Sequence, residues 1–188
     1  MRTMLRSLCI LRLLCRAGMP VGEPFVQSGI FLLQEAMGEN LDCGFYLDRY
    51  GPRSREIFEN ILVLEQEGKI TISGSPRGLL IEVTESGKAF VNKGGEWGAF
   101  FDVPPVRIPE DRIDAVFTVI SRDTPIGTES LGTALFFAIS ASSSDAFLEE
   151  LNAAKDEKKL SDEISNRSVI EALRRLKRLG IKFTGEDL

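Results

Sequence analysis

The sequence contains no histidine among its 188 residues. This absence excludes Ser-His-Asp and Cys-His nucleophilic sites, imidazole acid–base catalysis and imidazole metal ligands. Paired carboxylates remain possible, but the Asp and Glu residues fall on predicted outer faces with no cluster in a cleft. The motifs GxGxxG and GxSxG are absent, and Gly87-Lys88 lacks the other residues of a phosphate loop. We therefore expect a non-enzymatic protein.

Cysteine is scarce, with three residues and no CxxC pair: Cys9, Cys15 and Cys43. An odd number at these spacings argues against a disulfide framework and against a zinc site. It suits a reducing compartment, so we expect a cytoplasmic protein with no metal and no other cofactor. The three thiols are interpreted as small buried hydrophobic side chains.

Long hydrophobic runs are also lacking, and no stretch approaches the roughly 20 apolar residues that a membrane span requires. Residues 1–17 are rich in Arg and Leu and contain no acid, as in a transit peptide. The positions of Leu5, Leu8, Cys9 and Arg12 equally fit an amphipathic helix. We favour an ordinary first helix and expect no membrane partner.

The chain has no basic domain. Its net charge is −5, with 10 basic and 11 acidic side chains in residues 1–92 and 11 and 15 in residues 109–188. A dedicated nucleic-acid binder usually carries a basic domain. This chain offers only basic patches.

The first 92 residues have the pattern of a winged helix. Apolar residues at helical spacing predict helices at 3–17, 24–37, 53–67 and 85–92, the last capped by Thr84. Residues 43–50 predict an extended segment that ends at Gly51-Pro52. Residues 69–83 predict a β-hairpin with Arg77 at its tip.

Residues 93–108 predict a linker that contains the aromatic residues Trp97, Phe100 and Phe101. This cluster is either buried between two parts of the chain or exposed as an anchor for a partner. Residues 109–188 predict helices at 109–121 and 128–140, then one capped by Ser144 and a last one capped by Ser161 or Ser165.

These patterns predict a mainly α fold with a small β-hairpin. We expect an N-terminal winged helix-turn-helix domain at 1–92, a linker at 93–108 and a C-terminal helical domain at 109–188. The helical domain is expected to serve in dimerisation or partner binding, and the protein is expected to be a homodimer.

Four segments carry a resemblance: 30–34 (IFLLQ), 45–54 (FYLDRYGPRS), 61–68 (ILVLEQEG) and 84–90 (TESGKAF). Residues 22–91 as a whole resemble the YwgA-like winged-helix family, which is related in fold to the Panacea antitoxin domain. That family has an ILQ helix, a Y-G-P-x-S turn and a hairpin that closes on L-T-x-x-G. The resemblance implies a winged-helix fold and transcriptional or antitoxin-like regulation, and it implies no catalytic residue.

A winged helix presents its third helix and its hairpin tip to DNA, where basic and amide side chains read bases and hold phosphates. The candidate DNA-binding residues are Arg49, Arg53, Ser54, Arg55, Asn60, Lys69, Arg77 and Lys88. The third helix also presents Glu56, Glu59 and Glu67, which weaken phosphate binding. We expect DNA as the slightly favoured partner and another protein as the alternative.

The last predicted helix is strongly amphipathic. Ile170, Leu173 and Leu176 lie on one face, and Arg174 and Arg178 belong to a basic face. Such a helix contacts nucleic acid, an acidic partner or an anionic membrane, or it docks on its own core with its charges in water or lies in a dimer seam. The pattern alone favours the last two of these interpretations.

Overall fold

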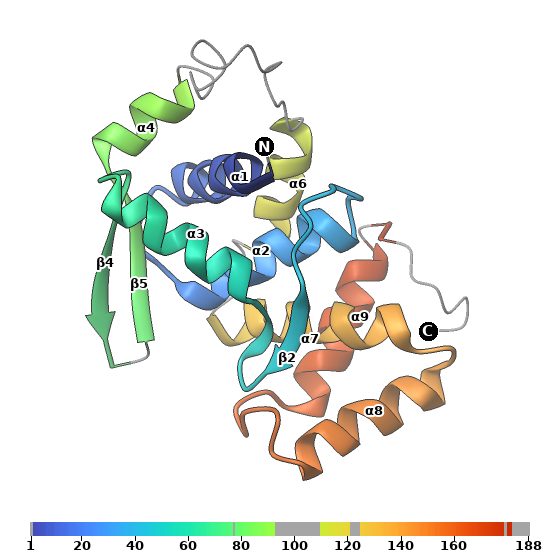
Figure 1. The fold of residues 1–188 in the computed structure, drawn as a ribbon. Helices are drawn as coiled ribbons and strands as arrows, with labels where there is room; N and C mark the ends of the chain where they lie inside the picture. Colours follow the sequence, from blue (N-terminus) through green and yellow to red (C-terminus); the bar gives the residue numbers. More distant parts are fainter. Residues whose placement is uncertain (1, 77, 93–109, 121–124, 179, 182–188) are drawn as a thin grey trace.

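The computed structural model describes residues 2–76, 78–92, 110–120, 125–178 and 180–181 (Figure 1). The described chain is mainly helical with a small antiparallel sheet, as the sequence predicts. The N-terminal elements are α1 (Arg2–Ala17), β1 (Val21–Gly22), α2 (Glu23–Glu35), β2 (Phe45–Asp48), β3 (Gly51–Ser54), α3 (Arg55–Gln66), β4 (Ile70–Ser75), β5 (Gly78–Val83) and α4 (Glu85–Asn92). The later elements are α6 (Glu110–Ile120), α7 (Pro125–Ser140), α8 (Ser144–Asp156) and α9 (Asn166–Arg178).

The N-terminal elements have the topology of a winged helix. Strands β4 and β5 form the predicted antiparallel hairpin, with Ile72 opposite Ile81. The short strand β1 pairs with the other edge of β5, so the sheet order is β1-β5-β4. Helices α1 and α2 contact β5, and α3 contacts β4. The sequence did not predict β1, because two residues are too few to show a period.

The segment between α2 and α3 differs from the prediction. Residues 51–54 form β3, which pairs with β2 in a second small hairpin, and α3 begins only at Arg55. Gly51 has φ 103°, a conformation that glycine adopts without strain, and it turns the chain back along β2. Pro52 therefore lies in a strand and not in the first turn of a helix. The prediction that the helix starts at residue 53 is wrong.

Short polar side chains cap the helices. The Ser54 hydroxyl accepts a hydrogen bond from the Ile57 amide, and the Thr84 hydroxyl accepts one from Gly87. Ser143, not Ser144, caps α8 by accepting from the Ala146 amide. The Ser165 hydroxyl accepts from the Ser168 amide at the start of α9, which selects one of the two predicted caps.

Helix α2 lies at the centre of the molecule. Every residue from Val26 to Leu33 is buried. Helices α1, α6 and α7 and strand β3 all pack on it. The two parts that the sequence separates at residues 93–108 therefore share one hydrophobic core.

Small residues allow the helices to approach closely at this centre. A Cβ atom on Gly132 of α7 would lie 2.8 Å from the Ser28 hydroxyl and 2.8 Å from Cδ of Pro52. A Cβ atom on Gly29 would lie 2.9 Å from Leu13 and 3.2 Å from Ile120. The Gly132 contacts join α7 to α2 and to the β2–β3 hairpin, and the Gly29 contacts join α2 to α1 and α6. Among the described helices, none is long and apolar enough to cross a membrane.

We predict that Gly132→Ala lowers the free energy of unfolding by about 1–3 kcal/mol, the usual cost of overpacking a core. The sign of this effect is informative, because a glycine-to-alanine substitution at an exposed position of a helix raises stability by about 1 kcal/mol. Chemical denaturation followed by circular dichroism measures the difference. The control is Gly74→Ala, since nothing lies within 4 Å of a Cβ atom at that position. Equal stability of the two variants would contradict the close contact between α7 and α2.

Candidate functional site

The outer face of α3 is the candidate functional surface. The Ser54 cap starts the helix, and Ile57, Ile61 and Leu64 anchor its inner face in the core. The exposed residues of the helix lie between the β2–β3 hairpin at its start and β4 at its end (Figure 1): Arg55, Glu59, Leu62, Val63, Glu65 and Gln66. In a winged helix this is the face that meets a partner.

Arginine is poorly available on this face. Arg55 is exposed, but its guanidinium forms an i,i+4 ion pair with Glu59 at 2.8 Å. Arg53 is the residue before the Ser54 cap, and its guanidinium forms ion pairs with Glu23 at 2.5 Å and with Asp48 at 2.7 Å. Of the two arginines predicted to contact DNA, Arg55 is therefore held in a surface ion pair and Arg53 in structural ion pairs.

Arg53 belongs to a polar network that joins α2 to the β2–β3 hairpin. The buried Gln27 side chain donates to the Ser54 carbonyl and accepts from the Ser54 amide. Burial raises the pKa of Asp48, but hydrogen bonds from Arg53 and the Arg49 amide outweigh it, and the pKa lies below its usual value. Burial lowers the pKa of Arg53, and its two carboxylate partners reverse this and raise it. The guanidinium thus stays charged and held in place.

Asn60 is not on the outer face, so that expectation is wrong. Its side chain is only 3% exposed. Its amide donates to the Glu56 carbonyl at 2.6 Å, and its oxygen accepts from the Ser7 hydroxyl of α1 at 3.1 Å. Asn60 therefore joins α3 to α1 and does not present its amide to a base.

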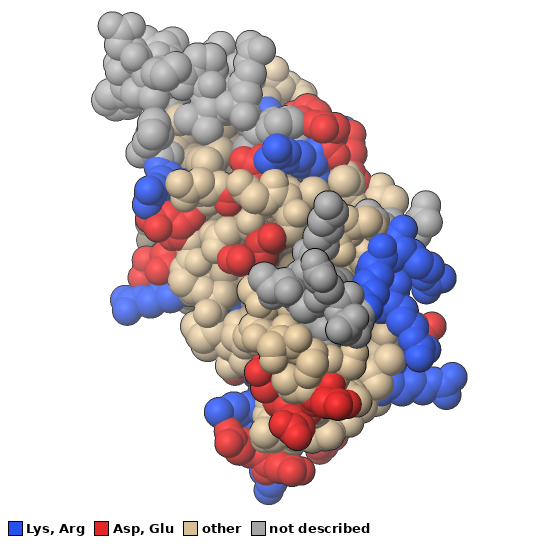
Figure 2. All heavy atoms as spheres, turned by 90° about the vertical axis from the view of Figure 1, so that its right-hand side faces the viewer, with Lys and Arg blue, Asp and Glu red and all other residues tan. Residues whose placement is uncertain are grey.

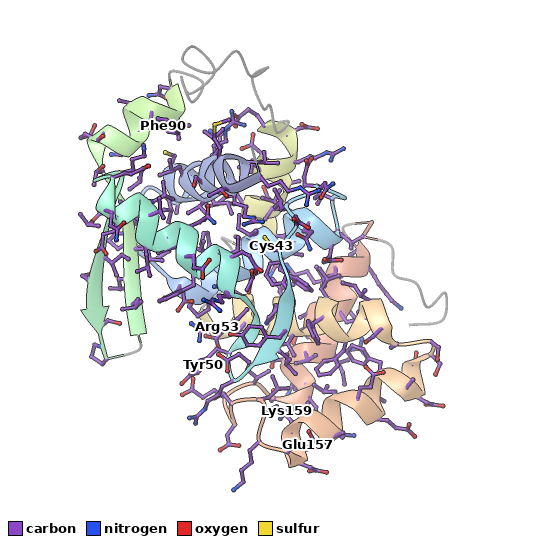
Figure 3. All side chains as sticks on the ribbon, viewed as in Figure 1. Cys43, Tyr50, Arg53, Phe90, Glu157 and Lys159 are labelled. Carbon is purple, nitrogen blue, oxygen red and sulfur yellow. The ribbon has the colours of Figure 1, made fainter. Side chains whose placement is uncertain are left out.

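The other predicted cations lie apart. Lys69 forms an ion pair with Glu67 and lies 4.5 Å from the ring centroid of Phe90, and Lys88 pairs with Glu85 at 2.7 Å. Arg49 stacks on Tyr50 at 5.8 Å, at the turn of the β2–β3 hairpin. Figure 3 shows Phe90 on α4 and Tyr50 near the hairpin turn, separated by the length of α3. Arg77 lies outside the described residues.

The structure explains Gly87-Lys88 without a phosphate. A Cβ atom on Gly87 would lie 2.2 Å from the Lys69 carbonyl oxygen. Glycine is therefore required for α4 to pack against the start of β4. Among the described residues, no group of His, Cys, Asp or Glu has the arrangement of a metal site.

Apolar and acidic side chains occupy the outer face of α3 instead. Leu62 is 38% exposed and Val63 is 40% exposed. The exposed acids around them are Glu59, Glu65 and Glu67. An apolar stripe read from the sequence would bury Leu62 together with Ile61, but the structure buries only Ile61.

Two exposed tyrosines lie on the hairpin beside the start of α3: Tyr46 is 54% exposed and Tyr50 is 42% exposed. The sequence predicts only an extended segment here; the alternation of Phe45 and Leu47 with Tyr46 is the signal that could have placed Tyr46 on the outer side. The predicted partner-binding residues Trp97, Phe100 and Phe101 lie outside the described residues.

The thiols are buried or partly buried and unpaired. All three cysteines are free. Burial raises the pKa of each, that of Cys43 to about 11, so they remain protonated near neutral pH. Protonated thiols are poor nucleophiles and poor metal ligands. These cysteines serve packing, as the sequence predicts for small hydrophobic residues.

Within the described part of the chain, the buried carboxyl group of Glu129 has no ion pair or hydrogen bond. Glu129 of α7 is 7% exposed, and its backbone carbonyl lies beside Gly51 at the β2–β3 turn. Burial, and secondarily the charge of Glu163, raise the pKa of Glu129 to about 7.

We predict that Arg53→Ala lowers the free energy of unfolding by about 2–3 kcal/mol. Breaking a fully buried ion pair costs about 3–5 kcal/mol. The expected cost is smaller here because the Arg53 side chain is 33% exposed. The control is Arg55→Ala, an exposed neighbour that we expect to change stability by less than about 1 kcal/mol. Urea denaturation measures both. If Arg55→Ala is as damaging as Arg53→Ala, the network around Glu23 does not support the hairpin.

We predict that Glu129→Gln stabilises the protein at about pH 8 by on the order of 2 kcal/mol. The pKa is raised in the folded state, so stability falls as pH rises from about 4.5 through about 7. The variant escapes this loss, and its advantage disappears near pH 4. Thermal unfolding across this range measures the effect, with exposed Glu149→Gln as the control. An advantage that does not change with pH would contradict the assignment.

No family model and no curated protein sequence matches the chain. Only the sequence segments quoted above therefore bear on which family the chain belongs to. The resemblance of residues 22–91 to the YwgA-like winged-helix proteins stays a prediction.

Proposed function

We propose that this chain is a non-enzymatic regulatory protein that binds another protein through the outer face of its winged helix. The observation that carries the proposal is the pair Leu62 and Val63, exposed at the centre of α3 and surrounded by carboxylates. The regulatory part of the proposal comes from the resemblance to the YwgA-like family.

The chemistry of this face suits a protein better than a duplex. Phosphate contacts dominate the affinity of most DNA binders. The described part of α3 offers one arginine, Arg55, and its charge is neutralised by Glu59. The two sequence candidates nearest to it, Arg53 and Asn60, are occupied in structural contacts.

Protein interfaces combine an apolar centre with a polar rim, and they are enriched in Tyr and Arg. Leu62 and Val63 supply the apolar centre. Tyr46 and Tyr50 extend the surface onto the hairpin, where Arg49 stacks on Tyr50. The acidic rim favours a partner that presents an apolar patch with basic residues around it.

DNA is the second candidate, and one observation favours it. The β1-β5-β4 sheet and α3 together have the arrangement that positions a recognition helix beside a wing. In that case Arg55 would make the principal contact from the helix. The following experiment distinguishes the two partners.

We predict that a photo-cross-linking amino acid at position 63 forms adducts with protein in the cells that produce the chain. The same group at Glu149, an exposed position of α8, is the control. Leu62→Asp in the cross-linking chain is expected to reduce the adduct several-fold, because it places a charge in the apolar centre. Mass spectrometry identifies the captured protein, and an adduct of twice the chain's mass identifies a second copy. Adducts with DNA alone, or none above the control, would overturn the proposal.

A further inference from the structure

Helix α9 presents a row of cations to solvent. Its inner face is buried through Val169, Leu173 and Leu176, which pack it on the core beside α7. The opposite face carries exposed Arg167, Arg174, Lys177 and Arg178. Figure 2 shows Lys and Arg side chains gathered in a band at one edge of the molecule, level with α9. We refer to Arg167, Arg174, Lys177 and Arg178 as the α9 basic face.

The cations of the α9 basic face lack the carboxylate partners that most other described cations have. Most described cations outside α9 form ion pairs with carboxylates: Arg2, Arg12, Arg16, Arg53, Arg55, Lys69, Lys88, Arg112 and Lys159. Within the described residues, none of the four cations of the α9 basic face has an ion pair. The one acid between them is Glu171, which is also exposed and unpaired.

Helix stability does not account for this arrangement. Arg174 and Arg178 are four residues apart, and like charges at that spacing destabilise a helix. Cations in the last turn interact favourably with the helix dipole, which explains part of the C-terminal cluster. Arg167 lies in the first turn, where the dipole disfavours a cation. The helix dipole therefore accounts for the cations in the last turn but not for the row as a whole.

The spacing matches an extended polyanion. Arg167, Arg174 and Arg178 are separated by seven and four residues, which places them on one side of the helix. At a rise of about 1.5 Å per residue, the row is roughly 16 Å long. A DNA duplex carries one negative charge per roughly 1.7 Å of its axis, so several phosphates lie within reach of the row.

The residue types favour nucleic acid over a membrane. An interfacial membrane helix inserts an exposed apolar face, but the apolar residues of α9 are buried in the core. Three of the four cations are arginines, whose planar guanidinium groups bind phosphate with two parallel hydrogen bonds. We propose that the α9 basic face binds the phosphate backbone of nucleic acid without sequence preference.

This site is separate from the proposed protein surface. Helix α9 packs on α7, and α7 packs on α2. In Figure 1, α3 lies to the left of the centre of the molecule and α9 to the right. Nucleic acid on α9 and a protein on α3 therefore occupy different surfaces, and either proposal can fail without the other.

The test is fluorescence anisotropy of labelled duplex DNA and single-stranded RNA of random sequence, at about 50 mM and about 200 mM salt. The variant is Arg167→Gln/Arg174→Gln/Arg178→Gln, which keeps good helix formers at each position. The control is Arg2→Gln/Lys158→Gln/Lys159→Gln, which removes the same charge from exposed positions outside both α9 and the winged-helix face. Circular dichroism verifies that both variants fold.

We predict salt-sensitive binding by the wild type and a loss of affinity of at least tenfold in the α9 variant. Its slope of log affinity against log salt is expected to fall by about three, one for each lost phosphate contact. The control is expected to bind like the wild type. No binding at low salt, or an equal loss in both variants, would overturn the proposal. Preferential binding to vesicles of anionic phospholipid, lost in the α9 variant, would overturn it in favour of a membrane.

Discussion

The burial of α2 from Val26 to Leu33 is the constraint on which the rest of the structure depends. A helix that is buried from Val26 to Leu33 needs neighbours on every side. Helices α1, α6 and α7 and the β2–β3 hairpin supply them, and Gly29 and Gly132 allow the closest of these contacts. The position of α3, and therefore of the surface that it exposes, follows from this packing. The Arg53–Glu23 pair and the Gln27–Ser54 hydrogen bonds set the hairpin against the first turns of α2.

Most of the helices and the β4–β5 hairpin could be predicted from the sequence, because apolar periodicity and terminating glycines mark them locally. Strand β3 could not, since Gly51-Pro52 signals a break and only pairing with β2 makes residues 51–54 a strand. The shared core was also missed: a glycine-rich and proline-rich stretch such as 93–108 suggests a boundary, whereas the contact of Gly132 with Ser28 is visible only in three dimensions.

The candidate site was harder to predict than the fold. Residue type indicated Arg53 and Asn60 as DNA-binding residues, but burial and pairing decide availability, and both depend on distant residues such as Glu23 and Ser7. The same principle separates the two surfaces proposed for this chain. Arg55 is neutralised by its neighbour Glu59, whereas Arg174 and Arg178 on α9 have no carboxylate partner in the described structure. The charge that matters for a partner is the charge left after internal pairing.

The central position of α2 has a consequence for synthesis of the chain. Helix α2 is synthesised before α7, which covers one of its sides and ends at Ser140. While the ribosome adds the residues between them, the apolar side of α2 that α7 will cover has no neighbour. The winged helix therefore cannot complete its core as an early, independent unit, in contrast to domains that fold one after another as they emerge. Any chaperone that attends this nascent chain would meet α2 as an exposed apolar helix until α7 has left the exit tunnel.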